Sequence, residues 1–261
     1  MLSFTSAQWS AWLAAFIFPL ARILAAVAST PILGNKEVPL QVRIGLSVLL
    51  TVLVAPTLQM PSDIDPASLQ GLLILLEQIL AGVVMGFAMR IIFAAAEMAG
   101  EVAGLQMGLG FASFYDPQNA SFQPILAQFL GVIVSLAFLA MDGHLMVLAA
   151  ISDSFQSFPV SAVMPSALGL HTLVSWAGSI FADALQISLP LLAALMMTNL
   201  ALGILTRSAP QLNLFAVGFP ITLGMGFLVL ALSMPYFRPL IEHFSHAGLT
   251  AMQRVVQQLA R

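Results

Sequence analysis

Apolar residues dominate the chain in long runs, and polar residues gather in short stretches between these runs. Six apolar segments can be delimited, and each reaches the roughly 20 residues that a membrane-spanning helix requires. They cover residues 9–34, 38–60, 67–95, 124–151, 168–205 and 212–237. Clusters of Gly, Pro, Asn, Ser and Asp separate them, as expected of turns. The pattern predicts an all-α protein built from long apolar helices and helical hairpins.

The last stretch of the chain has a different pattern. From residue 239 to residue 261, apolar residues recur at helical spacing and polar residues fill the positions between them. Such a pattern predicts an amphipathic helix that lies on a membrane or against a partner. We therefore expect one membrane-protein-like helical domain over residues 1–238 and a separate amphipathic helix over residues 239–261.

The third apolar segment is too long for a simple span. No proline interrupts the chain from Leu69 to Gly108. A helix of that length, about 40 residues, would extend for about 60 Å, roughly twice the thickness of the hydrocarbon layer. Two alternatives follow. The helix breaks near its glycines, or it extends far out of the bilayer and packs on other subunits.

Composition restricts the class of protein. Hydrophobic residues make up 60% of the 261 residues and charged residues only 7%, whereas soluble domains average roughly 25% charged residues. The chain is therefore an integral membrane protein or is buried in an assembly. With a net charge of −3 and no basic cluster it shows no footprint for nucleic acid. It has no cysteine, which excludes disulfide chemistry.

The distribution of charge conflicts with a regular six-span bundle. Basic residues occupy the first, third and fifth connections, among them Lys36, Arg90 and Arg207, whereas the second and fourth carry only acidic residues. The positive-inside rule would place the odd connections in the cytoplasm. Six spans would then put the C-terminal tail outside, although the tail is itself basic. One segment does not span, or the chain is not an ordinary lipid-embedded bundle.

Motifs for catalysis are weak. Asp142-Gly143-His144 places an acid beside a histidine, but the sequence holds no second metal-ligand pair, nucleophile elbow or phosphate-binding loop. We expect no enzyme activity, no metal and no cofactor.

Ionisable residues within apolar runs are the better candidates for function, because their burial in lipid is costly. Glu97 and Glu101 are four residues apart and share a helix face with Arg90. This stripe could line a water-filled path in a secondary transporter, or it could form ion pairs and pack against neighbouring helices. We assign Arg22, Arg90, Glu97, Glu101 and Arg207 to polar or partner contacts.

Glycines mark one face of the third segment. Gly82, Gly86, Gly100, Gly104 and Gly108 fall within about 80° of each other on a helical wheel. The last three form two overlapping G-x-x-x-G steps, which allow a neighbouring helix to approach closely. The register predicts a groove for helix packing.

The stretch that follows these glycines is neither a span nor an ordinary loop. Residues 104–119 combine three glycines with three aromatic residues and an Asp-Pro pair. Irregular backbone at membrane depth persists only where protein buries it or water wets it. A flexible aromatic segment in this setting suggests a constriction or gate.

The same stretch carries a family resemblance. Residues Gly104 to Pro117, GLQMGLGFASFYDP, resemble the central motif of the R-type subunits of bacterial type III protein-export gates, the FliR/SctT family. Further similar stretches are Phe18–Arg22, Thr30–Leu33, Asp142–Leu145, Asn199–Asn213 and Phe215–Pro220. The N-terminal and central motifs favour the flagellar branch, and the virulence branch (SctT) is the alternative.

The resemblance implies an architecture that the composition does not show. Family members join P-type and Q-type subunits (FliP and FliQ) in a conical assembly at the bacterial inner membrane, in the flagellar basal body, with FlhB and FlhA nearby. Unfolded export substrates pass through its channel, and membrane lipid surrounds it. A loop matched by residues about 106–117 closes the channel from inside.

The resemblance assigns roles within that loop. Gly108 and Gly110 would let it move, the aromatic side chains would fill the lumen, and Asp116 and Pro117 would end it. The implied plug residues are Met107, Gly108, Leu109, Gly110, Phe111, Ala112, Ser113, Phe114, Tyr115, Asp116 and Pro117.

Overall fold

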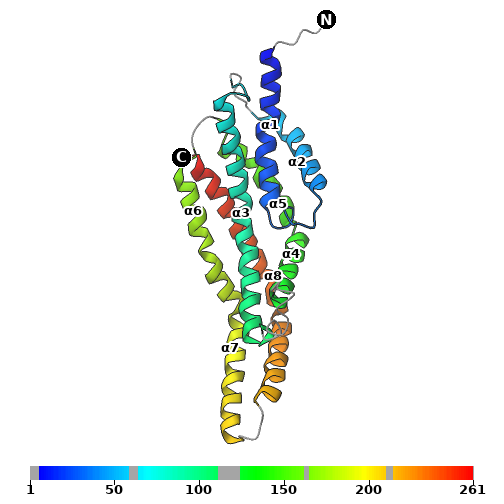
Figure 1. The fold of residues 1–261 in the computed structure, drawn as a ribbon, viewed down its shortest axis with the longest axis vertical. Coiled ribbons are helices and arrows are strands. Elements are labelled where there is room, and N and C mark those ends of the chain that lie inside the picture. Colours follow the sequence, from blue (N-terminus) through cyan, green and yellow to red (C-terminus); the bar gives the residue numbers. More distant parts are fainter. Residues whose placement is uncertain (1–5, 59–63, 111–123, 162–164, 210–213, 261) are drawn as a thin grey trace, which may run out of the picture. The chain divides into compact units, whose positions relative to one another are not determined.

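Helices make up the fold. The computed structural model describes residues 6–58, 64–110, 124–161, 165–209 and 214–260, and these ranges contain no strand. Figure 1 shows the elements, which confirm the all-α prediction. They are α1 (Ser6–Ser29), α2 (Leu40–Val54), η1 (Ala55–Thr57), α3 (Leu69–Gln106), α4 (Ile125–Ala140), α5 (Gly143–Ser157), α6 (Ala167–Ala177), α7 (Ser179–Ser208) and α8 (Leu214–Leu259).

The third helix extends rather than breaking. α3 has 38 residues, runs through Gly82, Gly86, Gly100 and Gly104, and ends at Gln106. At 1.5 Å per residue its length is about 57 Å, well beyond the roughly 30 Å of a hydrocarbon layer. Ser68 caps its start, because the amide of Gly71 donates to Ser68 Oγ at 3.0 Å.

Two of the expected segments are divided. The apolar segment 124–151 contains two helices, since α4 ends at Ala140 and α5 begins at Gly143. Asp142 between them has φ 57°, a left-handed conformation that no α-helix residue adopts. The segment 168–205 likewise contains two helices, α6 and α7, separated by Gly178.

The C-terminal region shows the opposite difference. α8 is one helix of 46 residues, and it contains Pro220, Pro235 and Pro239. The amphipathic stretch after residue 238 therefore continues the preceding apolar helix without a break in helical structure. The division of the chain into domains at that residue stays a prediction.

Helices of this kind satisfy their own polar groups. Hydroxyl groups donate to the carbonyl four residues earlier, as in Thr51 to Ser47 at 2.7 Å, Ser135 to Gly131 at 2.7 Å and Thr198 to Ala194 at 2.8 Å. Satisfying polar groups within the helix is what an apolar surrounding requires.

Five helical stretches are long and apolar enough to cross a membrane, and a sixth is added if α4 and α5 together form a broken span. Large apolar side chains are exposed along them, for example Leu76 on α3, Val174 on α6 and Met197 on α7. A water-soluble monomer would rarely expose so much apolar surface. The length and hydropathy of these helices are those of an integral membrane protein, and the topology stays a prediction.

The described chain falls into two compact units. Unit 1 comprises residues 1–91, 142–177 and 245–261, and unit 2 comprises residues 92–141 and 178–244. In unit 1, α1 and α2 form a hairpin (Figure 1). The Arg43 guanidinium holds its connection, donating from Nη2 to the carbonyls of Asn35 at 2.7 Å and Val38 at 2.8 Å.

The remaining helices of unit 1 are joined by a few specific contacts. Trp176 Nε1 of α6 donates to the carbonyl of Ala88 on α3 at 3.0 Å. The amide of Ser166, just before α6, donates to the carbonyl of Leu259 at the end of α8 at 3.0 Å. Thr172 and Gln258 form a further hydrogen bond between these two helices.

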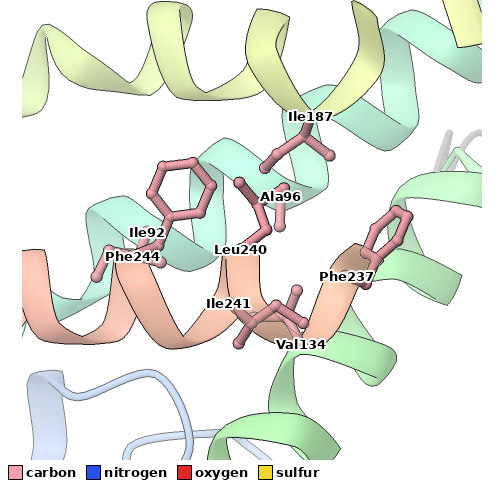
Figure 2. A pocket seen from close by; sticks show the side chains of 8 residues that line it. All are labelled: Ile92, Ala96, Val134, Ile187, Phe237, Leu240, Ile241 and Phe244. Atoms are coloured by element: carbon pink, nitrogen blue, oxygen red, sulfur yellow. The ribbon is translucent and has the colours of Figure 1, made fainter. Parts of the chain in front are cut away.

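Unit 2 packs the second half of α3 against α4, α7 and α8. Phe93 and Phe138 meet edge to face, with ring centroids 5.6 Å apart. Figure 2 shows a small apolar cavity among these four helices. Its volume of about 10 Å³ is at the lower limit for one water molecule, so it is a packing gap rather than a ligand pocket. Its lining residues are Ile92, Ala96, Val134, Ile187, Phe237, Leu240, Ile241 and Phe244.

Candidate functional site

A buried guanidinium lies at the centre of unit 1. Arg22 on α1 is 0% exposed. Its Nε donates to Gln78 Oε1 on α3 at 2.9 Å, and its Nη1 donates to Ser154 Oγ on α5 at 3.2 Å. Its Nη2 donates to the carbonyl of Phe158, just after α5, at 2.7 Å. The planar fork of arginine thus joins three helices, because it donates in several directions at once.

Aromatic rings cover the same guanidinium. Its carbon atom lies 4.1 Å from the ring centroid of Phe155 and 5.2 Å from that of Phe158. Both distances lie within the range of cation–π attraction. Arg22, assigned from the sequence to polar or partner contacts, therefore has its polar contacts within the chain.

Two neighbouring polar atoms on α3 are less well satisfied. Glu77 Oε2 and Gln78 Nε2 are buried, and neither has a hydrogen-bond partner among the described residues. Unsatisfied buried groups are costly. Gln78 therefore accepts from Arg22 through its Oε1, whereas its Nε2 and the Oε2 of the preceding Glu77 lack partners among the described residues.

The C-terminal end of α3 lies in unit 2. Met107 is 0% exposed, and its amide still makes a helical hydrogen bond to the carbonyl of Ala103 at 2.9 Å. Gly108 then adopts φ 84°, a conformation that favours glycine and ends the helix. Of the expected plug residues, Met107, Gly108, Leu109 and Gly110 are described, and Phe111, Ala112, Ser113, Phe114, Tyr115, Asp116 and Pro117 lie outside the described residues.

Met107 rests in a notch on α8. A β carbon placed on Gly226 would lie 2.6 Å from Met107 Cε and 2.7 Å from its Sδ. Non-bonded carbon atoms in contact normally lie about 3.5–4.0 Å apart. No side chain larger than that of glycine therefore fits at position 226 while Met107 keeps its place.

The glycines of α3 face different neighbours in the two units. In unit 1, a β carbon on Gly82 would overlap the carbonyl of Arg22, and one on Gly86 would overlap the Ser29 side chain of α1. In unit 2, a β carbon on Gly100 would lie 2.6 Å from Ala127 Cα on α4.

The last two glycines of the expected face differ from these. A β carbon on Gly104 would make an ordinary contact, 3.5 Å from Leu126 Cβ. Gly108 ends the helix and does not lie within it. The structure thus gives these glycines two packing partners and one helix terminus, and their role in function stays a prediction.

The other charged candidates are on the surface of the described chain. Arg90, Glu97, Glu101 and Arg207 are all exposed. Glu97 lies beside α4, where a β carbon on Gly131 would be 3.5 Å from its Oε1. Their assignment to partner contacts stays a prediction. Among the described residues, no three His, Asp or Glu side chains are grouped to hold a metal ion.

Sequence reasoning missed several residues of these sites. Gln78 and Ser154 hold Arg22, and Gly226 receives Met107. The sequence could have singled out Gln78, since it is a polar residue inside an apolar run. Nothing in the sequence distinguishes Ser154 and Gly226, because serine and glycine are common in such helices.

Comparisons with known proteins identify the family of the chain. The family model described as bacterial export proteins, family 1, matches residues 13–247. The flagellar biosynthetic protein FliR of Pectobacterium carotovorum is 40% identical over all of this chain and 99% of its own length. The proteins of the same name from Escherichia coli and Bacillus subtilis are 38% and 30% identical, covering 99% and 93% of this chain and 99% and 94% of their own lengths. The chain belongs to family 1 of the bacterial export proteins.

Proposed function

We propose that the chain is a core subunit of the flagellar type III protein-export gate, in the bacterial inner membrane at the flagellar basal body. The observation that supports this most is the family match over residues 13–247, together with full-length relatives named as flagellar biosynthetic proteins. Its role is to build a protein-conducting channel with other subunits and to help close it, without catalysing a reaction.

The apolar surface supports assembly with partners. α3 is longer than a bilayer requires, and it exposes Leu76, Phe87 and Leu105 along its length. A helix that leaves the bilayer must cover such residues with protein. The proposed partners are P-type and Q-type subunits (FliP and FliQ), with FlhB and FlhA nearby, and the proposed cargo is unfolded protein.

Co-purification tests this assembly. We expect the chain to be unstable when produced alone and to co-purify with other small membrane proteins when it is produced together with P-type and Q-type subunits. Size-exclusion chromatography and mass spectrometry of the extracted material would show the subunits. A stable monomer that binds or moves a small solute would instead support a secondary transporter using Arg90, Glu97 and Glu101.

The stretch after α3 is proposed to close the channel. Gly108, with φ 84°, ends the helix and redirects the chain at the start of this stretch. Beyond it the sequence places Phe111, Phe114 and Tyr115 close together. Bulky aromatic side chains in a protein-lined lumen would exclude water and ions. Asp116 and Pro117 would return the chain towards the next helix.

Deleting residues 108–116 tests this closure. We expect the assembled complex to leak ions or small molecules in planar bilayers, because the lumen loses its filling residues. A variant of unchanged length, with Gly and Ser replacing residues 111–116, separates lost volume from shortened chain. Unchanged conductance of both variants in complexes of normal composition would contradict the proposed closure.

A further inference from the structure

The contact between α3 and α8 in unit 2 is aligned along a single seam. Met107 meets Gly226, whereas Ala99 and Ala103 share a cavity with Leu230, Ser233 and Phe237. Rising numbers on α3 thus pair with falling numbers on α8, so the two helices run antiparallel there. Gly226, Leu230, Ser233 and Phe237 recur at helical spacing and form one face of α8. Met107 directly follows Gln106, the last residue of α3, and marks the end of this seam.

Little space is available for Met107 to move along the seam. The cavity that Ala103 and Leu230 line further along the seam has a volume of about 20 Å³, which is room for about one water molecule and not for a displaced thioether side chain. Met107 itself is fully buried. A methionine can adapt to irregular surroundings, but here its Cγ, Sδ and Cε all lie against Gly226.

The backbone changes direction immediately after this contact. Gly108 has φ 84°, and its amide donates to the carbonyl of Leu105 at 3.0 Å. Leu109 folds back towards Gly104, with its Cδ1 3.9 Å from the position of a β carbon there. The direction in which the chain leaves α3 is therefore set within three residues of Met107.

We infer that Met107 and Gly226 form a knob-and-notch contact that fixes where the chain leaves α3, and that both are positioning residues for the closed gate. The functional part of this inference rests on the proposed function, since it assumes that the stretch after Gly108 closes a channel. The structural part rests on the described contact alone.

A pair of glycine substitutions on α8 provides the first test. Gly226→Ala forces Met107 out of its notch, whereas Gly224→Ala on the same helix enters open space. We expect the Gly226→Ala complex to leak about tenfold more than the unaltered complex in planar bilayers, as overpacking displaces the start of the closing stretch. The Gly224→Ala complex should match the unaltered one. Equal leak of the two variants would overturn the inference.

A second substitution removes the knob instead of filling the notch. Met107→Ala should also raise the leak, because the notch is left empty. In the double variant Met107→Ala/Gly226→Ala the added methyl meets no thioether, so its leak should not exceed that of Met107→Ala alone. Additive effects of the two changes would contradict a direct contact between them.

Cysteine cross-linking tests the contact between positions 107 and 226 even if the Gly226→Ala variant fails to assemble. The chain has no natural cysteine. A β carbon at position 226 lies 2.6 Å from Met107 Cγ, so the two β carbons fall within the reach of a disulfide. Met107→Cys/Gly226→Cys should cross-link in the oxidised complex and lower its leak, and a reductant should raise the leak again. Met107→Cys/Gly224→Cys should not cross-link.

The outcomes separate the two proposals. Absence of cross-linking between positions 107 and 226 in an assembled complex would overturn the inference and leave the proposed function standing. Cross-linking without any effect on leak, in a complex whose 108–116 deletion does leak, would overturn the positioning role. If the deletion does not leak, the proposed closure fails, and only the structural contact is supported by the cross-link.

Discussion

Arg22→Met is expected to be among the most damaging single substitutions in unit 1. It leaves three acceptors without their donor, namely Gln78 Oε1, Ser154 Oγ and the carbonyl of Phe158. Each unsatisfied buried acceptor costs about 1–3 kcal/mol. Methionine keeps only an apolar stem, so the contact of the guanidinium with the Phe155 ring is lost together with the hydrogen bonds. We expect a total destabilisation of about 3–5 kcal/mol.

The measurement is the amount of assembled complex and its denaturation temperature in detergent. Arg254→Met is the matched control, because Arg254 is exposed on α8. Arg22→Lys should restore little, since one ammonium group cannot donate in the three directions of the guanidinium plane. Arg22→Met/Gln78→Leu should cost less than the sum of its parts, because the apolar leucine removes an orphaned acceptor. An Arg22→Met complex as stable as the Arg254→Met complex would refute this account.

The hydropathy pattern predicted correctly that the chain is helical, but it predicted less accurately where each helix begins and ends. Long apolar runs require helices, because each helix satisfies its own backbone groups. The break at Asp142 was missed because a left-handed non-glycine residue has no periodic signal. The expected segment 212–237 already runs through Pro220 and Pro235, but the continuation of α8 past Pro239 was not predicted. Proline usually interrupts a helix in water, but membrane helices tolerate it.

The candidate sites were also predicted only in part. Arg22 was singled out from the sequence because a cation inside an apolar run is rare and costly. Its partners were not, since Gln78 and Ser154 lie 56 and 132 residues away along the chain. Gly226 is one of 18 glycines, and only its proximity to Met107 distinguishes it. Contacts between distant segments are set by tertiary packing, which one sequence does not display.

Glycine-to-alanine substitutions on α3 should have large effects that depend on the neighbouring backbone. A β carbon on Gly82 would lie 2.8 Å from Ala25 Cβ and 2.9 Å from the amide nitrogen of Ala26 on α1. One on Gly100 would lie 2.6 Å from both Ala127 Cα and the Leu126 carbonyl oxygen on α4. Backbone atoms of a packed helix cannot rotate away as a side chain can. The helices must therefore separate, at an expected cost of about 1–3 kcal/mol or more for each substitution.

Matched controls are present in the same two units. β carbons on Gly45 of α2 and Gly203 of α7 would meet no atom within 4 Å. In an exposed helix interior, alanine is more favourable than glycine by roughly 0.5–1 kcal/mol. Gly45→Ala and Gly203→Ala should therefore leave the denaturation temperature unchanged or raise it, whereas Gly82→Ala and Gly100→Ala should lower it. Because helix propensity favours alanine in all four variants, a lower stability at 82 and 100 isolates the close approach of α1 and α4 to α3. If all four variants denature at the same temperature, these contacts do not hold the helices together.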